Sequence, residues 1–252
     1  MQRIIMCLLV FVLGFSANVW AQETALTVRA KANDAKFIGT AMSGVQVSVT
    51  HAHTGEMLAQ GIITGGTGST ETLMEEPIER GEKISNESAA AFKTALDIEV
   101  PTPLNIRVHG PLAGGTTTVD ASKSVWLLPG EDVTGDGIVF HLYGFVVVPL
   151  APHANTKVEA GEELTLQAYV TMLCGCAISS GGMWDADNYK VEAQIWDGDT
   201  LVKRVPMHIG GEDGVFSATY VPRTSGSYRI IFTVGDFDSN NYGAAYTGIA
   251  VK

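Results

Sequence analysis

The sequence has few charged residues, few cysteines and fewer basic than acidic residues. Only 17% of its 252 residues are charged, and 16 Lys and Arg stand against 27 Asp and Glu, for a formal net charge of −11. This balance argues against a nucleic-acid-binding protein, which needs a basic face to neutralise phosphates. A disordered chain is equally disfavoured, because 46% of the residues are hydrophobic and disordered segments are poor in such residues.

The motifs of several enzyme classes are also missing. The sequence contains no Walker or dinucleotide-binding glycine pattern, and no nucleophile elbow surrounds Ser179 and Ser180. Its 28 glycines instead lie mainly between extended segments, where turns need a positive φ. We therefore predict that the protein is not an enzyme.

The first 21 residues have the pattern of a secretory signal peptide. An apolar run spans 4–15, and Val19 and Ala21 occupy positions −3 and −1 of a small-residue cleavage site. The run is too short to cross a bilayer, which takes about 20 residues. We therefore predict a signal peptide at 1–21 and an exported protein, periplasmic or extracellular, with no membrane span in the mature chain.

Alternation of apolar and polar side chains recurs along the rest of the chain, with Gly, Pro or Asp turns between the segments. The clearest segments are 45–50, 164–172, 189–195 and 228–234. Period-two alternation is typical of half-buried antiparallel strands. We therefore predict an all-β fold of two consecutive antiparallel β-sandwich domains, at 22–145 and 146–252.

One segment favours a helix. Residues 85–95 contain Asn86 as a candidate N-cap and three consecutive alanines. The stretch around its start, 64–88, is rich in Gly, Thr, Glu and Ser. We expect that stretch to form a long excursion from a sheet.

The first half resembles the transthyretin-like or carboxypeptidase-regulatory-like β-sandwich. The resemblance is carried by 44–50 and 54–59, which form a strand, a Thr-Gly-Glu turn and a returning strand. The family's short T-D-x-x-G segment is replaced here by the long segment 64–97. The resemblance implies a fold and no activity.

The second half, 155–252, resembles an immunoglobulin-like or fibronectin-like sandwich. The segment 224–230 matches the usual run into strand F, with Tyr228 as the tyrosine-corner candidate. Ile230 stands where immunoglobulin domains have their second cysteine. The resemblance therefore implies the architecture without the inter-sheet disulfide.

Two loops of this second domain form the candidate site. In such sandwiches the B–C and F–G loops lie at the same end, and here these loops follow Met172 and Val234. The B–C loop carries Cys174 and Cys176, which are the only cysteines left once the signal peptide is removed. One glycine between them places the pair at the outer edge of disulfide geometry.

Three interpretations of this Cys-Gly-Cys loop stay open. The pair could form a structural disulfide, a labile disulfide for redox exchange, or a soft metal site. For the metal site, Cys174 and Cys176 would act with Met172 and Met183, a set of sulfur ligands that suits Cu(I).

The F–G loop offers a candidate calcium site. Asp236, Asp238 and Asn240 alternate as at the start of a calcium-binding loop. Asn241 and Thr247 stand where an EF-hand has Gly and Glu, so any calcium site here would not be an EF-hand. Apart from copper or calcium we expect no cofactor.

Two aromatic residues of the same loops, Trp184 and Tyr242, are candidate binding residues, because aromatic side chains dominate contact surfaces. We therefore expect an exported binding or assembly module whose partner is a protein or a glycan. One alternative is a periplasmic copper- or redox-handling protein that uses the Cys-Gly-Cys loop. Another is an accessory subunit of an extracytoplasmic enzyme.

Overall fold

The computed structural model describes residues 22–252, and the predicted signal peptide lies outside the described residues. The described part is built from sixteen strands in four sheets. The strands are β1 (Gln22–Ala32), β2 (Val45–His51), β3 (Met57–Ile63), β4 (Phe92–Ile98), β5 (Thr102–Gly110), β6 (Val119–Leu127), β7 (Val133–Leu142), β8 (Phe145–Ala151), β9 (Thr156–Val158), β10 (Leu164–Met172), β11 (Lys190–Asp197), β12 (Thr200–Pro206), β13 (His208–Ile209), β14 (Val215–Tyr220), β15 (Gly226–Asp236) and β16 (Asn241–Val251).

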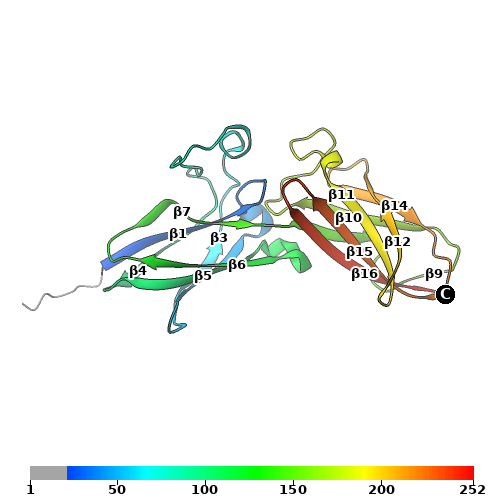
Figure 1. Ribbon diagram of the computed structural model, residues 1–252, viewed down its shortest axis with the longest axis horizontal. Coiled ribbons are helices and arrows are strands. Elements are labelled where there is room, and N and C mark those ends of the chain that lie inside the picture. Colours follow the sequence, from blue (N-terminus) through cyan, green and yellow to red (C-terminus); the bar gives the residue numbers. More distant parts are fainter. Residues whose placement is uncertain (1–21) are drawn as a thin grey trace, which may run out of the picture.

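Short helical turns connect some of these strands, and none of the described helices is long and apolar enough to cross a membrane. The turns are η1 (Thr40–Met42), η2 (Glu71–Glu75), η3 (Leu112–Thr117) and η4 (Ala186–Asn188). The sheets make two sandwich-like domains that lie end to end (Figure 1). The all-β prediction is therefore confirmed.

The first sandwich packs the sheet β4-β1-β7 against the sheet β3-β2-β5-β6. Its core follows the predicted alternation, since Val45, Val47 and Val49 of β2 are fully buried. The hairpin β2–β3 agrees with the strand, turn and returning strand expected there. One detail differs from a purely antiparallel sandwich, because β1 pairs with β7 in parallel.

The second sandwich packs β13-β14-β10-β8 against β12-β11-β15-β16-β9. Here β9 pairs in parallel with β16. The tyrosine corner is confirmed, because the buried Tyr228 hydroxyl donates to the Thr224 carbonyl oxygen at 3.0 Å. This bond fixes the chain as it enters β15.

The chain passes from one sandwich to the other through only two residues, between the end of β7 and the start of β8. Both domains hold this link. The buried Asn241 side chain accepts from the Gly144 amide at 2.5 Å and donates to the Gly144 carbonyl at 3.2 Å. From the first domain, the Asn33 backbone N–H donates to the carbonyl of Leu142, the residue just before the link, at 2.8 Å.

The predicted helix at 85–95 is wrong. β4 begins at Phe92, and the segment before it carries no helix. The Arg29 guanidinium explains this, because its Nη1 donates to the carbonyls of Ala89 at 2.5 Å and Ala90 at 2.9 Å. Those carbonyls are therefore unavailable to a helical ladder.

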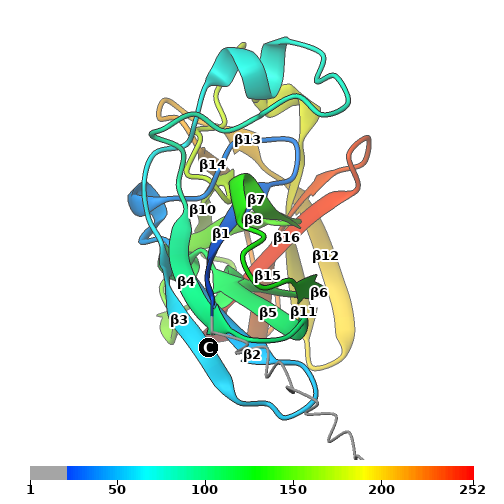
Figure 2. The same cartoon turned by 90° about the vertical axis from the view of Figure 1, so that its left-hand side faces the viewer.

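The excursion between β3 and β4 is confirmed, and it stands above the strands in Figures 1 and 2. Asp136 anchors it, since its carboxylate accepts from the amides of Ile84 at 3.0 Å and Ser85 at 2.8 Å. Burial raises the pKa of Asp136, but hydrogen bonds from Ser85 and Ile84 outweigh it, so the pKa lies below its ordinary value.

Candidate functional site

The two predicted loops meet, and they meet against the first domain. Asn33 Nδ2 donates to the Ser239 carbonyl of the F–G hairpin at 3.3 Å. The next residue, Asp34, accepts from Trp184 Nε1 of the B–C loop at 2.9 Å. Two consecutive residues after β1 therefore contact both loops. We call this contact between the β1 turn and the two loops the domain junction.

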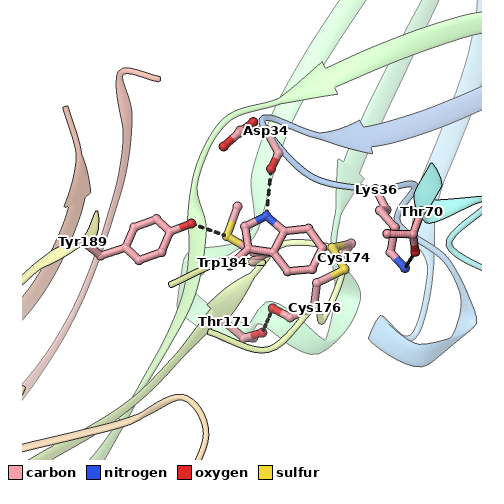
Figure 3. The surroundings of a disulfide bond; sticks show 9 residues. Asp34, Lys36, Thr70, Thr171, Cys174, Cys176, Trp184 and Tyr189 are labelled. Carbon is pink, nitrogen blue, oxygen red and sulfur yellow. Dashed lines mark hydrogen bonds between the residues drawn. A yellow bond between two sulfur atoms is a disulfide. The ribbon is translucent and has the colours of Figure 1, made fainter. Parts of the chain in front are cut away.

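Trp184 belongs to the domain junction rather than to an open surface. Its side chain is only 9% exposed, and Figure 3 shows the indole nitrogen directed at the Asp34 backbone. A hydrogen bond within the loop fixes the Trp184 backbone, because its carbonyl accepts from the Ser179 backbone amide at 3.1 Å. Trp184 therefore contacts the first domain, and a role for it in binding a partner stays a prediction.

The Cys-Gly-Cys segment is a tight turn beside Trp184 (Figure 3). A disulfide joins Cys174 and Cys176, whose Cα atoms are 5.4 Å apart. The Gly175 amide donates to the Met172 carbonyl at 2.8 Å, and Thr171 Oγ1 donates to the Cys176 carbonyl at 2.8 Å. Cys174 is 1% exposed, so one sulfur lies in the core and its partner nearer the surface.

Gly175 is the residue that brings this turn onto the first domain. Its φ of +79° is in the left-handed region. A Cβ at this position would lie 2.7 Å from Met42 Sδ and 3.1 Å from Met42 Cγ. Met42 ends η1 of the first domain. No local sequence pattern indicates this contact, because the two residues belong to different domains.

The predicted sulfur ligands do not share one environment. Met172 is buried and its Sδ accepts from the Tyr189 hydroxyl at 3.9 Å, whereas Met183 is 47% exposed. The sulfur atoms of Cys174 and Cys176 face each other within the turn. Among residues 22–252 no group of three or more His, Cys, Asp and Glu side chains is placed to hold a metal ion. Copper binding stays a prediction.

The acidic F–G turn uses its first carboxylate internally. Asp236 Oδ1 accepts from the amides of Asp238 at 3.0 Å and Ser239 at 3.2 Å, and Oδ2 accepts from the Ser239 hydroxyl at 2.6 Å. Asn240 adopts a φ of +54°, which this residue type tolerates in turns. These contacts account for the Asp-x-Asp-x-Asn pattern as a hairpin turn. Calcium binding there stays a prediction.

Acidic side chains gather around the domain junction. Burial raises the pKa of Tyr189, and the charges of Asp236, Asp34 and Asp185 raise it further. Burial also raises the pKa of Asp34, with Asp236 adding to the effect and Lys31 opposing it. The junction is therefore a place where negative charge is costly, and Tyr189 stays a neutral hydrogen-bond donor.

A second feature lies on the outer face of the five-stranded sheet. Cross-strand partners share one face of a sheet, so the register places three rows of side chains there. The rows are Lys190–Gly235–Tyr242, Glu192–Thr233–Ala244 and Gln194–Ile231–Tyr246. The first two rows have small residues, Gly235 and Thr233, at their centre, and a depression of about 480 Å³ lies over these two rows. We call this depression the sheet dish.

Aromatic side chains flank the sheet dish and stay open to solvent. Phe237 and Tyr242 line the sheet dish and are 63% and 50% exposed, and Tyr246, in the third row of the same face, is 69% exposed. Phe237 and Tyr242 meet edge to face, with ring centroids 5.5 Å apart. Both rings lean over Gly235, where a Cβ would lie 3.2 Å from Tyr242 Cδ1 and 3.3 Å from Phe237 Cε2. Tyr242 is thus an exposed aromatic residue, as predicted, on a surface that the sequence did not define.

Charged side chains form the opposite side of the sheet dish. The Glu192 side chain is only 11% exposed, with Lys190 Nζ at 3.1 Å and Arg204 Nη1 at 3.7 Å from its carboxylate oxygens. Thr233 Oγ1 donates to the Glu192 carbonyl at 3.4 Å. One buried carboxylate is thus held between two half-exposed cations.

No protein-family model matches the chain, and no curated protein matches it. Among solved structures, fibronectin(III)-like modules of CbhA from Clostridium thermocellum are 11% identical, with 94% of this chain and 92% of that chain covered and a TM-score of 0.31. The titin domains z1z2, in complex with telethonin, are 12% identical, with 92% and 88% covered and a TM-score of 0.25. An engineered protein is 19% identical over 50% of this chain, with a TM-score of 0.33, and this chain spans only 24% of its length. No functional conclusion follows from these likenesses.

Proposed function

We propose that this chain is an exported, non-enzymatic binding or assembly module whose contact surface is the outer face of the β12-β11-β15-β16-β9 sheet. One observation carries the proposal: Phe237 and Tyr242 line one depression of this face and are each at least half exposed, and Tyr246 is exposed in the third row of the same face. Clustered exposed aromatic side chains are typical of surfaces that bind partners. Such residues often supply the largest part of a binding energy.

The domain junction has a different role in this proposal. Its loops contact the first domain through Trp184 and Gly175, so they orient the second sandwich instead of meeting a partner. The first sandwich, of the proposed transthyretin-like kind at 22–145, then acts as a support for the second at 146–252. Export rests on the signal-peptide pattern at 1–21.

A binding assay with paired variants tests this function. The mature chain, 22–252, is labelled and applied to immobilised glycans and to proteins extracted from the envelope of its own organism. We expect the double variant Tyr242→Ala/Tyr246→Ala to lose the signal, because the aromatic contacts are removed. The control is Trp126→Ala, which removes an aromatic side chain that is 63% exposed on β6 of the first domain.

Each result of this assay has a clear meaning. Loss of binding in the double variant, with retention in Trp126→Ala and an unchanged ligand after incubation, supports the proposal. Equal binding by both variants would place the contact surface elsewhere. Chemical conversion of the ligand, or no bound partner for the wild-type chain, would contradict a binding module.

A further inference from the structure

The floor of the sheet dish admits a flat ligand. Thr233 and Ala244 are paired on two neighbouring strands at its centre, while the rings of Tyr242 and Phe237 cover Gly235 beside them, so a ligand can approach the sheet over Thr233 and Ala244. Strands lie about 4.8 Å apart and alternate residues about 6.7 Å apart, which gives the floor the footprint of one or two pyranose rings. A volume of about 480 Å³ falls within the roughly 300–1,000 Å³ of small-molecule sites.

The aromatic side of the dish suits the apolar face of a sugar ring. An aromatic ring carries negative charge on its face and positive charge at its edge. The C–H groups of a pyranose present weakly positive hydrogens to such a face. Tyr242 and Phe237 remain half exposed or more, although they contact each other and Gly235. Both rings therefore keep exposed surface that a ligand can contact.

The charged side of the dish suits hydroxyl groups. Lys190 and Arg204 supply N–H donors, and Glu192 between them supplies acceptor oxygens whose charge is already compensated. A sugar hydroxyl can donate and accept at once, so it can bind such a group of donors and acceptors without bringing a charge. The chain as a whole carries a net charge of −11, and that charge repels polyanions at long range.

From the floor, the aromatic side and the charged side together, we infer that the sheet dish is a saccharide-binding site for an uncharged glycan. A sugar ring lies on Thr233 and Ala244, stacks on Tyr242, and directs its hydroxyls at Glu192 and Arg204. This inference rests on the proposed function and names the ligand class for the same surface.

The test measures binding of soluble oligosaccharides to the chain 22–252 by titration calorimetry. The neutral probes are gluco-, manno- and xylo-oligosaccharides, and the acidic probes are oligogalacturonate and alginate oligomers. We expect one of the neutral probes to bind. Tyr242→Ala should weaken it by about tenfold, whereas Tyr242→Phe keeps the stacking ring and should change it less than about threefold.

Two further variants locate the site. Glu192→Gln keeps the size of the side chain, removes the acceptor charge and should weaken the neutral probe by about tenfold. Trp126→Ala, on the other domain, should leave the affinity unchanged. Circular dichroism spectra that match the wild type show that each variant is folded, and Tyr242→Phe provides the evidence on stacking if Tyr242→Ala does not fold.

The outcomes separate this inference from the proposed function. Binding of acidic probes alone would overturn the uncharged ligand. Binding of a neutral probe that is insensitive to Tyr242→Ala and Glu192→Gln would overturn the location. If no sugar binds but an envelope protein does, and the double variant loses that protein, the saccharide inference is wrong and the binding function stands. If neither a sugar nor a protein binds, both are wrong.

Discussion

Replacing Gly175 by alanine tests the domain junction at its tightest point. Gly175 has a φ of +79°, and an added Cβ would lie 2.7 Å from Met42 Sδ. An added methyl group is therefore unfavourable for two separate reasons. The left-handed backbone at residue 175 disfavours a Cβ, and the methyl group would overlap Met42 of the other domain. The two can be separated, because only the second depends on Met42.

The two contributions have similar sizes. The left-handed conformation costs an L-residue about 1–2 kcal/mol. The contact with Met42 adds about 1–2 kcal/mol, at the lower end of overpacking effects because a methionine side chain can shift. We expect Gly175→Ala to lower the free energy of unfolding by about 2–4 kcal/mol. For a chain of this length that corresponds to a fall in Tm of roughly 5–15 °C.

A double-mutant cycle with Met42→Ala isolates the contact. In that background the added methyl group has room, so Gly175→Ala should cost only the backbone share of about 1–2 kcal/mol. Urea and thermal unfolding of the four proteins, followed by circular dichroism with the disulfide verified by mass spectrometry, provide the values. Equal costs in the two backgrounds, within about 0.5 kcal/mol, would refute contact between the turn and the first domain.

Three other perturbations examine the same region. Trp184→Phe keeps a ring but loses the bond to the Asp34 carbonyl, and we expect urea unfolding to show a loss of about 1–2 kcal/mol; an unchanged midpoint would mean that the indole is free. Asp34→Asn should stabilise the chain at pH 7 by less than about 0.5 kcal/mol. The pKa of Asp34 is raised by burial, so this group costs the wild type stability as pH rises from the ordinary value of 3.8 through the raised folded value. The difference in unfolding free energy between the wild type and Asp34→Asn, measured from pH 3 to 7, should show this slope. Thiol titration of the exported protein should find no free thiol before reduction and two afterwards, from the disulfide of Cys174 and Cys176; free thiols with stoichiometric copper would instead favour a copper-handling protein.

The strand pattern could be predicted because residues close together in the sequence determine it. The alternation at 164–172 corresponds to β10, and 45–50 falls within β2. The Tyr228 corner also depends on a short sequence run. In each case the burial of one residue is decided by neighbours two positions away, so a single sequence contains the signal.

The helix and the role of Trp184 could not be predicted because distant residues decide them. Arg29 binds the alanine carbonyls of the expected helix from another strand. Trp184 lies in a glycine-rich loop, which looks like a surface loop until Asp34 is placed against it. Both placements have the same physical origin, since tertiary contacts override local propensity.

The sheet dish was missed for a related reason. Its residues come from four strands, and only the pairing register shows that Lys190, Gly235 and Tyr242 form one row. Tyr242 lies on the open surface, whereas Trp184 lies in the domain junction.

The loops of the second domain are closed against the first domain, while the sheet face is open. Hydroxyl-radical footprinting of the mature chain, read by mass spectrometry, measures both at once. We expect Tyr242 and Tyr246 to be oxidised readily, and Trp184, which is 9% exposed, to react far more slowly than Trp126, which is 63% exposed. Oxidation of Trp184 as fast as Trp126, or protection of Tyr242 and Tyr246 in the absence of ligand, would contradict the claim.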